Sequence, residues 1–232
     1  MKNKYIDVNH PTVKALVSQL TADKKNEIEK LEAIFNYVRD DIEFAFLKRA
    51  DLMSASEVLL ARKGQCNNKS ILFHALCKGA GIKSRIHYST IRKEIHHGLF
   101  KGILFMLMPK EISHSWIEVN INGNWISIDN FINDLAFYNG GKAKLKKEGR
   151  DTGYSVSCAG GESSPNLDLD GSKFVQMGAV VEDQGIYDNP EEYFNSSKYK
   201  NNPSALKMLI YRLHLKGINR RIDSIRKQKY TT

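Results

Sequence analysis

Apolar side chains recur at helical spacing through the first fifty residues of the chain. One such stripe lies within residues 13–20, and a second lies within residues 28–38. Since residues three and four apart share a face of an α-helix, this pattern predicts two amphipathic helices. Ser54 followed by Glu57 is the capping-box pattern, which predicts a further short helix over residues 55–61.

A third helix and a series of strands are expected next. The helix should begin at about Cys66 and end at Gly79 and Gly81, because glycine is frequent just after helix C-termini. We expect strands in the three stretches where apolar and β-branched side chains dominate, which are residues 82–88, 99–108 and 114–121.

The dipeptide Asn122-Gly123 directly follows the last of these strands. It is the strongest short signal for a two-residue hairpin turn, and it predicts that residues 125–129 form the return strand. Such a turn sets Ile117 opposite Ile128, so that one face of the hairpin is apolar. A register slip of one residue would move polar side chains onto that face, and this disfavours the slip.

The last ninety residues divide into a polar stretch and a helix. Residues 140–171 are rich in Gly, Ser, Lys and Asp, and we expect a long excursion that is either a lid or a surface loop. Residues 174–181 have a strand pattern. A final helix is expected to start at Asn202-Pro203 and to run to about residue 229. Its predicted apolar stripe is Leu206, Leu209, Ile210, Leu213, Ile218, Ile222 and Ile225.

The composition is that of one soluble globular domain spanning residues 1–232. Of its residues 41% are hydrophobic and 26% are charged, and a chain of 232 residues can bury one sizeable core. No apolar run is long enough to span a bilayer, and the N-terminus has no signal-peptide pattern. Three cysteines, an odd number, argue against a disulfide framework. We therefore expect a cytoplasmic protein.

The positive charge is concentrated at the C-terminus. The net charge is +9, and the residues from Lys198 to Thr232 contain ten Lys and Arg against the single acid Asp223. A basic tail can bind nucleic acid. The sequence contains no nucleic-acid-binding fingerprint, so the favoured interpretation is a solvated helix face.

Cys66 is the best candidate for a reactive thiol. It lies at a predicted helix N-terminus, where free N–H groups and the helix dipole are expected to lower its pKa and could bind an oxyanion. Cys77 falls late in the same helix, in a position suited to burial, and Cys158 lies in the polar excursion. No CxxC or HxxxH pair is present, so the sequence implies no metal site and no cofactor.

The hairpin register brings a histidine and a carboxylate to one face. His114 and Trp116 share the polar face of their strand, and Asp129 on the return strand is a diagonal neighbour of His114. We expect the Asp129 carboxylate to accept the Nδ1–H of His114 and so fix its tautomer. With Cys66, these residues are the parts of a nucleophilic acyl-transfer site.

Three segments resemble the transglutaminase-like superfamily. They are Leu59 to Cys66 (LLARKGQC), Gly81 to Arg85 (GIKSR) and the strand His114 to Val119 (HSWIEV), and Asp129 falls where the family has its third triad member. The resemblance covers about residues 28–135. It implies an α+β, papain-like core with the nucleophile helix packed on an antiparallel sheet.

The resemblance also implies the activity and the site. It implies catalysis by Cys66, His114 and Asp129, with a peptide or small-molecule acyl substrate. We expect Gln65, Trp116 and Trp125 to contribute to oxyanion or substrate binding.

Two positions depart from the family pattern. Asn67 stands where the animal crosslinking members carry an aromatic residue, and this argues against glutamine–lysine crosslinking. Lys83 replaces a proline that is common in the family.

The sequence leaves the reaction open. The expected chemistry is acyl transfer to an amine or to water through a thioester on Cys66. Two enzymatic alternatives are a cysteine peptidase or amidase and an arylamine N-acetyltransferase-like enzyme. The non-enzymatic alternative is a module that binds nucleic acid or another partner through the basic C-terminal helix. No sequence feature indicates an oligomeric state.

Overall fold

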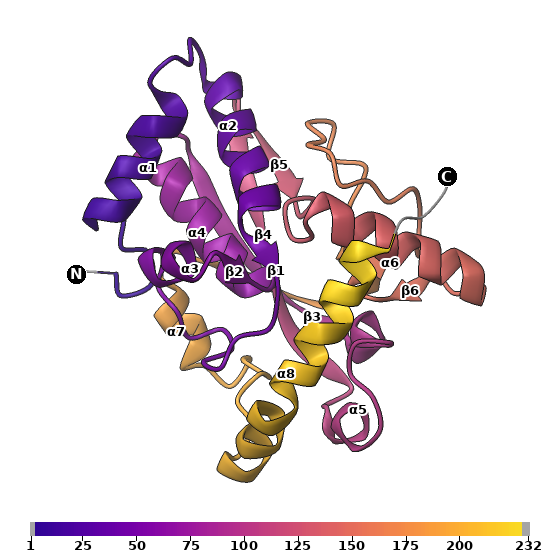
Figure 1. Ribbon diagram of the computed structural model, residues 1–232. Coiled ribbons are helices and arrows are strands. Elements are labelled where there is room, and N and C mark those ends of the chain that lie inside the picture. Colours follow the sequence, from indigo (N-terminus) through magenta and orange to yellow (C-terminus); the bar gives the residue numbers. More distant parts are fainter. Residues whose placement is uncertain (1–2, 229–232) are drawn as a thin grey trace.

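A four-stranded antiparallel sheet forms the centre of the molecule, and the computed structural model describes residues 3–228 (Figure 1). The strand order is β5-β4-β3-β8. The sheet strands are β3 (Ser84–Arg92), β4 (Glu111–Ile121), β5 (Asn124–Ile128) and β8 (Val180–Tyr187). Two short pairs lie outside it, parallel β1 (Glu43–Phe44) with β2 (Lys63–Gly64) and antiparallel β6 (Thr152–Gly153) with β7 (Val156–Ser157).

The N-terminal third is helical, as its apolar periodicity predicts. Its helices are α1 (Pro11–Thr21), α2 (Glu27–Asn36) with a following π-helical turn (Tyr37–Asp41), and α3 (Ala55–Ala61). The capping box at Ser54 and Glu57 is confirmed, because each side chain bonds the main chain of the other residue. These helices gather around α4 on one side of the molecule in Figure 1.

Helix α4 (Cys66–Gly79) packs against β4 and β3. It is buried from Asn67 to Cys77, which includes polar side chains near its start. The Lys69 ammonium donates to the carbonyls of Ile42 at 2.7 Å and Arg39 at 3.2 Å, and burial lowers the pKa of Lys69 to about 7. These bonds tie the N-terminal end of α4 to the π-helical turn that follows α2.

The hairpin between β4 and β5 has the predicted register. Ile117 pairs with Ile128, and Asn120 pairs with Trp125. Asn122 and Gly123 both have positive φ, at 52° and 90°, which a two-residue turn of this kind requires. The antiparallel sheet with its flanking helices confirms the predicted α+β fold class.

Three stretches differ from the sequence-based prediction. The strand expected over residues 99–108 is wrong, since helix α5 (Ile103–Leu107) lies there. A short apolar run does not distinguish strand from helix by periodicity. The excursion expected over 140–171 is wrong in its first part, because helix α6 (Leu135–Glu148) continues to residue 148.

Glycines inside α6 explain the second error. Gly140 and Gly141 are buried, and a Cβ on Gly141 would lie 3.1 Å from the Tyr154 carbonyl oxygen. Gly141 therefore permits close packing inside a helix rather than marking a loop. Residues 174–179 are not the expected strand either, since the last sheet strand begins at Val180.

The chain ends in two further helices, α7 (Pro190–Phe194) and α8 (Ala205–Lys227), and the end predicted near residue 229 lies outside the described residues. The predicted stripe of α8 is only half buried. Its second half is in the core at Ile218, Ile222 and Ile225, while Leu206, Leu209 and Leu213 are exposed.

Basic side chains of α8 also take part in the fold. Arg226 forms an ion pair with Asp134 at 2.7 Å and donates to the Phe44 carbonyl at 2.9 Å. Part of the C-terminal charge therefore holds α8 against α6 and β1. No helix within residues 3–228 combines the length and apolar character of a bilayer span.

Candidate active site

Cys66 is the first residue of α4, at the tip of the helix that packs against the sheet. Gln65 is its N-cap, and the Gln65 amide donates to Oδ1 of Asn68 at 3.3 Å. The preceding Gly64 approaches the helix closely, since a Cβ there would lie 2.9 Å from the Asn68 Cβ. Glycine at position 64, two residues before the cysteine, is thus needed for this close approach to α4.

The Cys66 thiol is half-buried and lies against main-chain amides. The amides of Asn67 and Ser115 act to lower its pKa, but burial raises the pKa of Cys66 to about 12, with a smaller contribution from the Asp51 carboxylate. The expectation that the helix N-terminus would lower this pKa is wrong, because desolvation outweighs the amides. The thiol is therefore neutral at pH 7.

His114 lies on β4 directly before the Ser115 amide that faces the thiol. The residue is fully buried and pairs with Ser89 of β3. Neither ring nitrogen has a hydrogen-bond partner within the described residues. Burial, with a smaller effect of His96, lowers the pKa of His114 to about 3, so the imidazole is also neutral.

Asp129 directly follows β5, and its carboxylate is fully buried. It accepts the amides of Val175 at 2.7 Å, Gln176 at 2.6 Å and Met177 at 2.9 Å. Burial raises the pKa of Asp129 to about 6, and these three amides oppose the rise. The carboxylate thus anchors the segment that leads into β8.

The predicted hydrogen bond from His114 to Asp129 is absent. The Asp129 oxygens accept main-chain amides, and both His114 nitrogens are unpartnered among the described residues. The three predicted catalytic residues thus come from the tip of α4 and from two paired strands. No hydrogen bond joins their side chains.

The three predicted accessory residues lie in different surroundings. Gln65 is buried, and its Nε2 donates to the Asp51 carboxylate. Trp116 is buried on β4, where it stacks on His87 at 4.3 Å, and its ring centre lies 6.3 Å from that of His114.

Trp125 lies at the far end of the hairpin. It is 43% exposed, and the Arg85 guanidinium lies 3.9 Å from its ring centre. Its partner Asn120 is five residues beyond Ser115, about 17 Å along an extended strand. This position does not support a role for Trp125 at the oxyanion.

Sequence reasoning missed a buried carboxylate next to the nucleophile. Asp51 is fully buried and accepts Tyr199 Oη and Asn201 Nδ2, each at 2.9 Å, besides Gln65 Nε2. Burial raises the pKa of Asp51, and these donors oppose the rise. Its partners lie up to 150 residues away along the chain, so no local pattern indicates this cluster.

No group of three or more His, Cys, Asp or Glu side chains in residues 3–228 is arranged to hold a metal ion.

The chain is similar to known proteins in sequence and in structure. The chain is 25% identical to the mouse (Mus musculus) kyphoscoliosis peptidase over 121 residues, which are 49% of this chain but only 17% of that protein. The chain thus spans about a sixth of the length of this relative.

Two crystal structures show partial similarity. One is of a candidate cysteine protease from Cytophaga hutchinsonii, with 21% identity, a TM-score of 0.41, and coverage of 53% of this chain and 37% of that one. The other is of a candidate protease from Parabacteroides distasonis, with 16% identity, a TM-score of 0.36, and coverage of 49% and 22%.

The family model of the Transglutaminase-like superfamily matches residues 14–130, half of the chain. The match includes the helix tip with Cys66, the strand with His114 and the end of β5 with Asp129. The chain therefore belongs to the transglutaminase-like superfamily.

Proposed function

We propose that the protein is a thiol-dependent acyltransferase or hydrolase in which Cys66 is the nucleophile and His114 the general base. The observation that carries this proposal is the position of the Cys66 thiol against the amide that follows His114. A buried imidazole with both nitrogens unpartnered is costly for the fold. Proton transfer gives such a group a function.

The reaction begins from a neutral thiol and a neutral imidazole. As the Cys66 sulfur bonds to the carbonyl carbon of an amide, ester or thioester, its proton passes to His114. The bond to the leaving group then breaks, and His114 returns the proton to the leaving group. Water or an amine attacks the resulting thioester, with His114 again as the base.

Main-chain amides are suited to stabilise the oxyanion. The Ser115 and Asn67 amides already face the sulfur, and Gln65 adds a side-chain amide directly before the nucleophile. Preorganised donors of this kind are often the largest single contribution to acyl transfer. Asp129 acts in this proposal as a positioning residue, since it holds residues 175–177 beside the site.

Ester acylation tests the proposal. The full chain is mixed with p-nitrophenyl acetate, and release of p-nitrophenolate is followed together with the mass of the Cys66 peptide. We expect one acetyl group on Cys66, and loss of that acylation in Cys66→Ser and His114→Gln. The matched control is Cys158→Ser, a half-buried thiol elsewhere in the chain. Equal turnover in Cys66→Ser would overturn the proposal.

Added amine distinguishes the two reaction types. Hydroxylamine competes with water for the acyl-enzyme, and the hydroxamate it forms can be counted against the free acid. A transferase is expected to yield mainly hydroxamate at low amine concentration, and a hydrolase mainly acid.

A further inference from the structure

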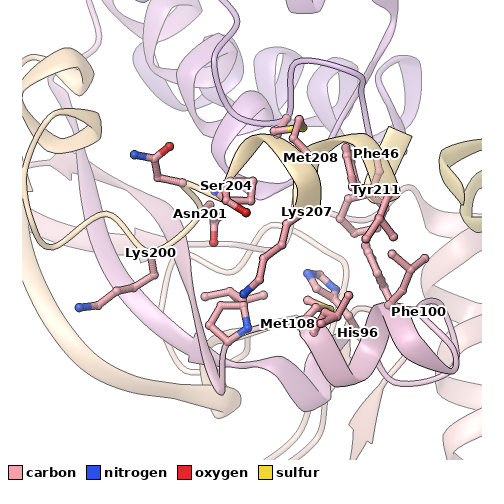
Figure 2. Close-up of a pocket in the computed structure, with 18 of the residues that line it drawn as sticks. Phe46, His96, Phe100, Met108, Lys200, Asn201, Ser204, Lys207, Met208 and Tyr211 are labelled. Carbon is pink, nitrogen blue, oxygen red and sulfur yellow. The ribbon is translucent and has the colours of Figure 1, made fainter. Parts of the chain in front are cut away.

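A mostly apolar cavity lies between the first turns of α8 and the segment around α5. Its volume is about 330 Å³, which is within the range of small-ligand sites. Figure 2 shows Met208 and Tyr211 of α8 on one side and Met108, His96 and Phe100 on the other. Apolar residues of its wall include Phe46, Phe100, Leu104, Met108, Met208 and Tyr211.

Three residues of the wall connect this cavity to the candidate active site. Gln65 directly precedes the nucleophile, and Ile112 lies two residues before His114 on β4. The third is His96, which is 8% exposed and close enough that it acts to lower the pKa of His114. Neither Cys66 nor His114 lines the cavity, so a ligand in it would contact residues next to the thiol and the base along the chain.

Much of the wall comes from outside the region that defines the family. The superfamily match ends at residue 130, while Lys200, Asn201, Lys207, Met208 and Tyr211 all line the cavity. Lys200 and Lys207 are exposed at its edge. An apolar interior with a polar edge is typical of a site that takes the apolar part of a ligand and leaves its polar part in water.

We propose that this cavity binds an extended aliphatic chain of the acyl donor, and that α8 sets the donor specificity. This inference rests on the proposed function, because it takes Cys66 as the acylated residue. Each buried methylene increases the binding constant about fourfold. Donors with longer apolar groups should therefore acylate Cys66 faster until the cavity is full.

A series of esters tests the inference with the full-length chain. The acylation kcat/KM is measured for p-nitrophenyl acetate, butyrate, hexanoate and octanoate. We expect a rise of roughly fourfold per methylene, which ends in a plateau. In Met208→Trp, which fills the cavity, the ratio of octanoate to acetate should fall at least tenfold.

Two further variants distinguish filling of the cavity from misfolding. Leu209→Trp places the same ring on the neighbouring exposed position of α8, and its ester profile should match that of the parent chain. Met208→Ala enlarges the cavity and should move the plateau to longer esters. If acetate and octanoate react equally in the parent chain, the cavity is not a donor site, although acylation of Cys66 would still stand.

A binding measurement separates this inference from the proposed function. In Cys66→Ala, which cannot be acylated, octanamide should raise the melting temperature, and acetamide at the same concentration should not. Met208→Trp should abolish the octanamide shift, while Leu209→Trp should keep it. Binding without any acylation of the parent chain would overturn the proposed function alone. Absence of the octanamide shift would overturn the cavity inference.

Discussion

The side chain of Asn201 pairs with the main chain of Ser113 as a neighbouring strand would. Its Oδ1 accepts the Ser113 amide at 2.9 Å, and its Nδ2 donates to the Ser113 carbonyl at 3.0 Å. The Asn67 side chain donates to the same carbonyl at 3.4 Å. The segment around Asn201 therefore lies directly beside the residues that follow Cys66 and precede His114.

Asn201→Asp should expose the thiol. The change removes both N–H donors and places a carboxylate against the Ser113 carbonyl and the Asp51 carboxylate. Loss of about 1.4 kcal/mol of local stability corresponds to a tenfold larger open population. We expect Cys66 to react with iodoacetamide roughly tenfold faster, measured by mass spectrometry of its peptide.

The neighbouring Asn202→Asp is the matched control for this variant. It introduces the same charge one residue away, on an exposed side chain. Equal alkylation rates in the two variants would show that Asn201 does not limit access to the thiol.

Asp51→Asn should lower the pH at which Cys66 reacts. The Asp51 carboxylate is among the causes that raise the pKa of Cys66 to about 12. Removing its negative charge favours the thiolate, so the pKa falls and alkylation becomes faster at each pH below 12. The measurement is the pH profile of iodoacetamide labelling at Cys66. The control is Asp23→Asn, because Asp23 is an exposed carboxylate on the loop after α1. This variant should have the same pH profile of labelling as the parent chain.

The parts of the fold and site that could be predicted share one property: their signals are local. The Asn122-Gly123 turn determines the register that pairs Ile117 with Ile128. The helix starting at Cys66 is likewise indicated by the glycine before it and the apolar positions after it. Sequence patterns of a few residues are sufficient for such elements.

The parts that could not be predicted depend on distant contacts. Asp129 directly follows the predicted return strand, yet its partners are amides of residues 175–177, in a segment without a clear pattern. The buried hydrogen-bond cluster around Asp51 forms only in the folded chain, because Tyr199 and Asn201 are distant from Asp51 in the sequence. Burial in turn reverses the expected direction of the Cys66 pKa, and burial is a property of the whole fold.

Asp129→Asn should destabilise the protein. The carboxylate accepts three amides, and an Asn side chain replaces one acceptor oxygen with a donor that faces them. Loss of a buried hydrogen bond to a charged group costs about 1.5–3 kcal/mol, so the free energy of unfolding in urea should fall by that amount.

Asp168→Asn is the control for this effect of burial. Asp168 also accepts three amides, those of Asp170, Ser172 and Lys173, but its hydrogen bonds lie mostly in an exposed loop. The free energy of unfolding should therefore fall by less than about 1 kcal/mol in Asp168→Asn. An equal loss in both variants would contradict the anchoring role of Asp129.

Buried neutral histidines should make the fold sensitive to acid. Burial lowers the pKa of His74 to about 3 from its ordinary 6.5, and its Nδ1 lies 2.9 Å from Ser84 Oγ. Between these two pH values the unfolded chain binds a proton that the folded chain does not. Stability is thus full above pH 6.5 and falls by about 1.4 kcal/mol per pH unit for this histidine as the pH drops toward 3.

His74→Asn should remove this contribution from the pH dependence. We expect the unfolding free energy, measured by urea titration from pH 7 to pH 4, to decline less steeply by about 1.4 kcal/mol per pH unit. His96 and His114 should keep their own contributions, because burial lowers both pKa values to about 3 as well. His214→Asn changes an exposed imidazole on α8 and should preserve the parent slope. An unchanged slope in His74→Asn would mean that His74 is protonated in the folded protein, which would contradict its burial as a neutral side chain.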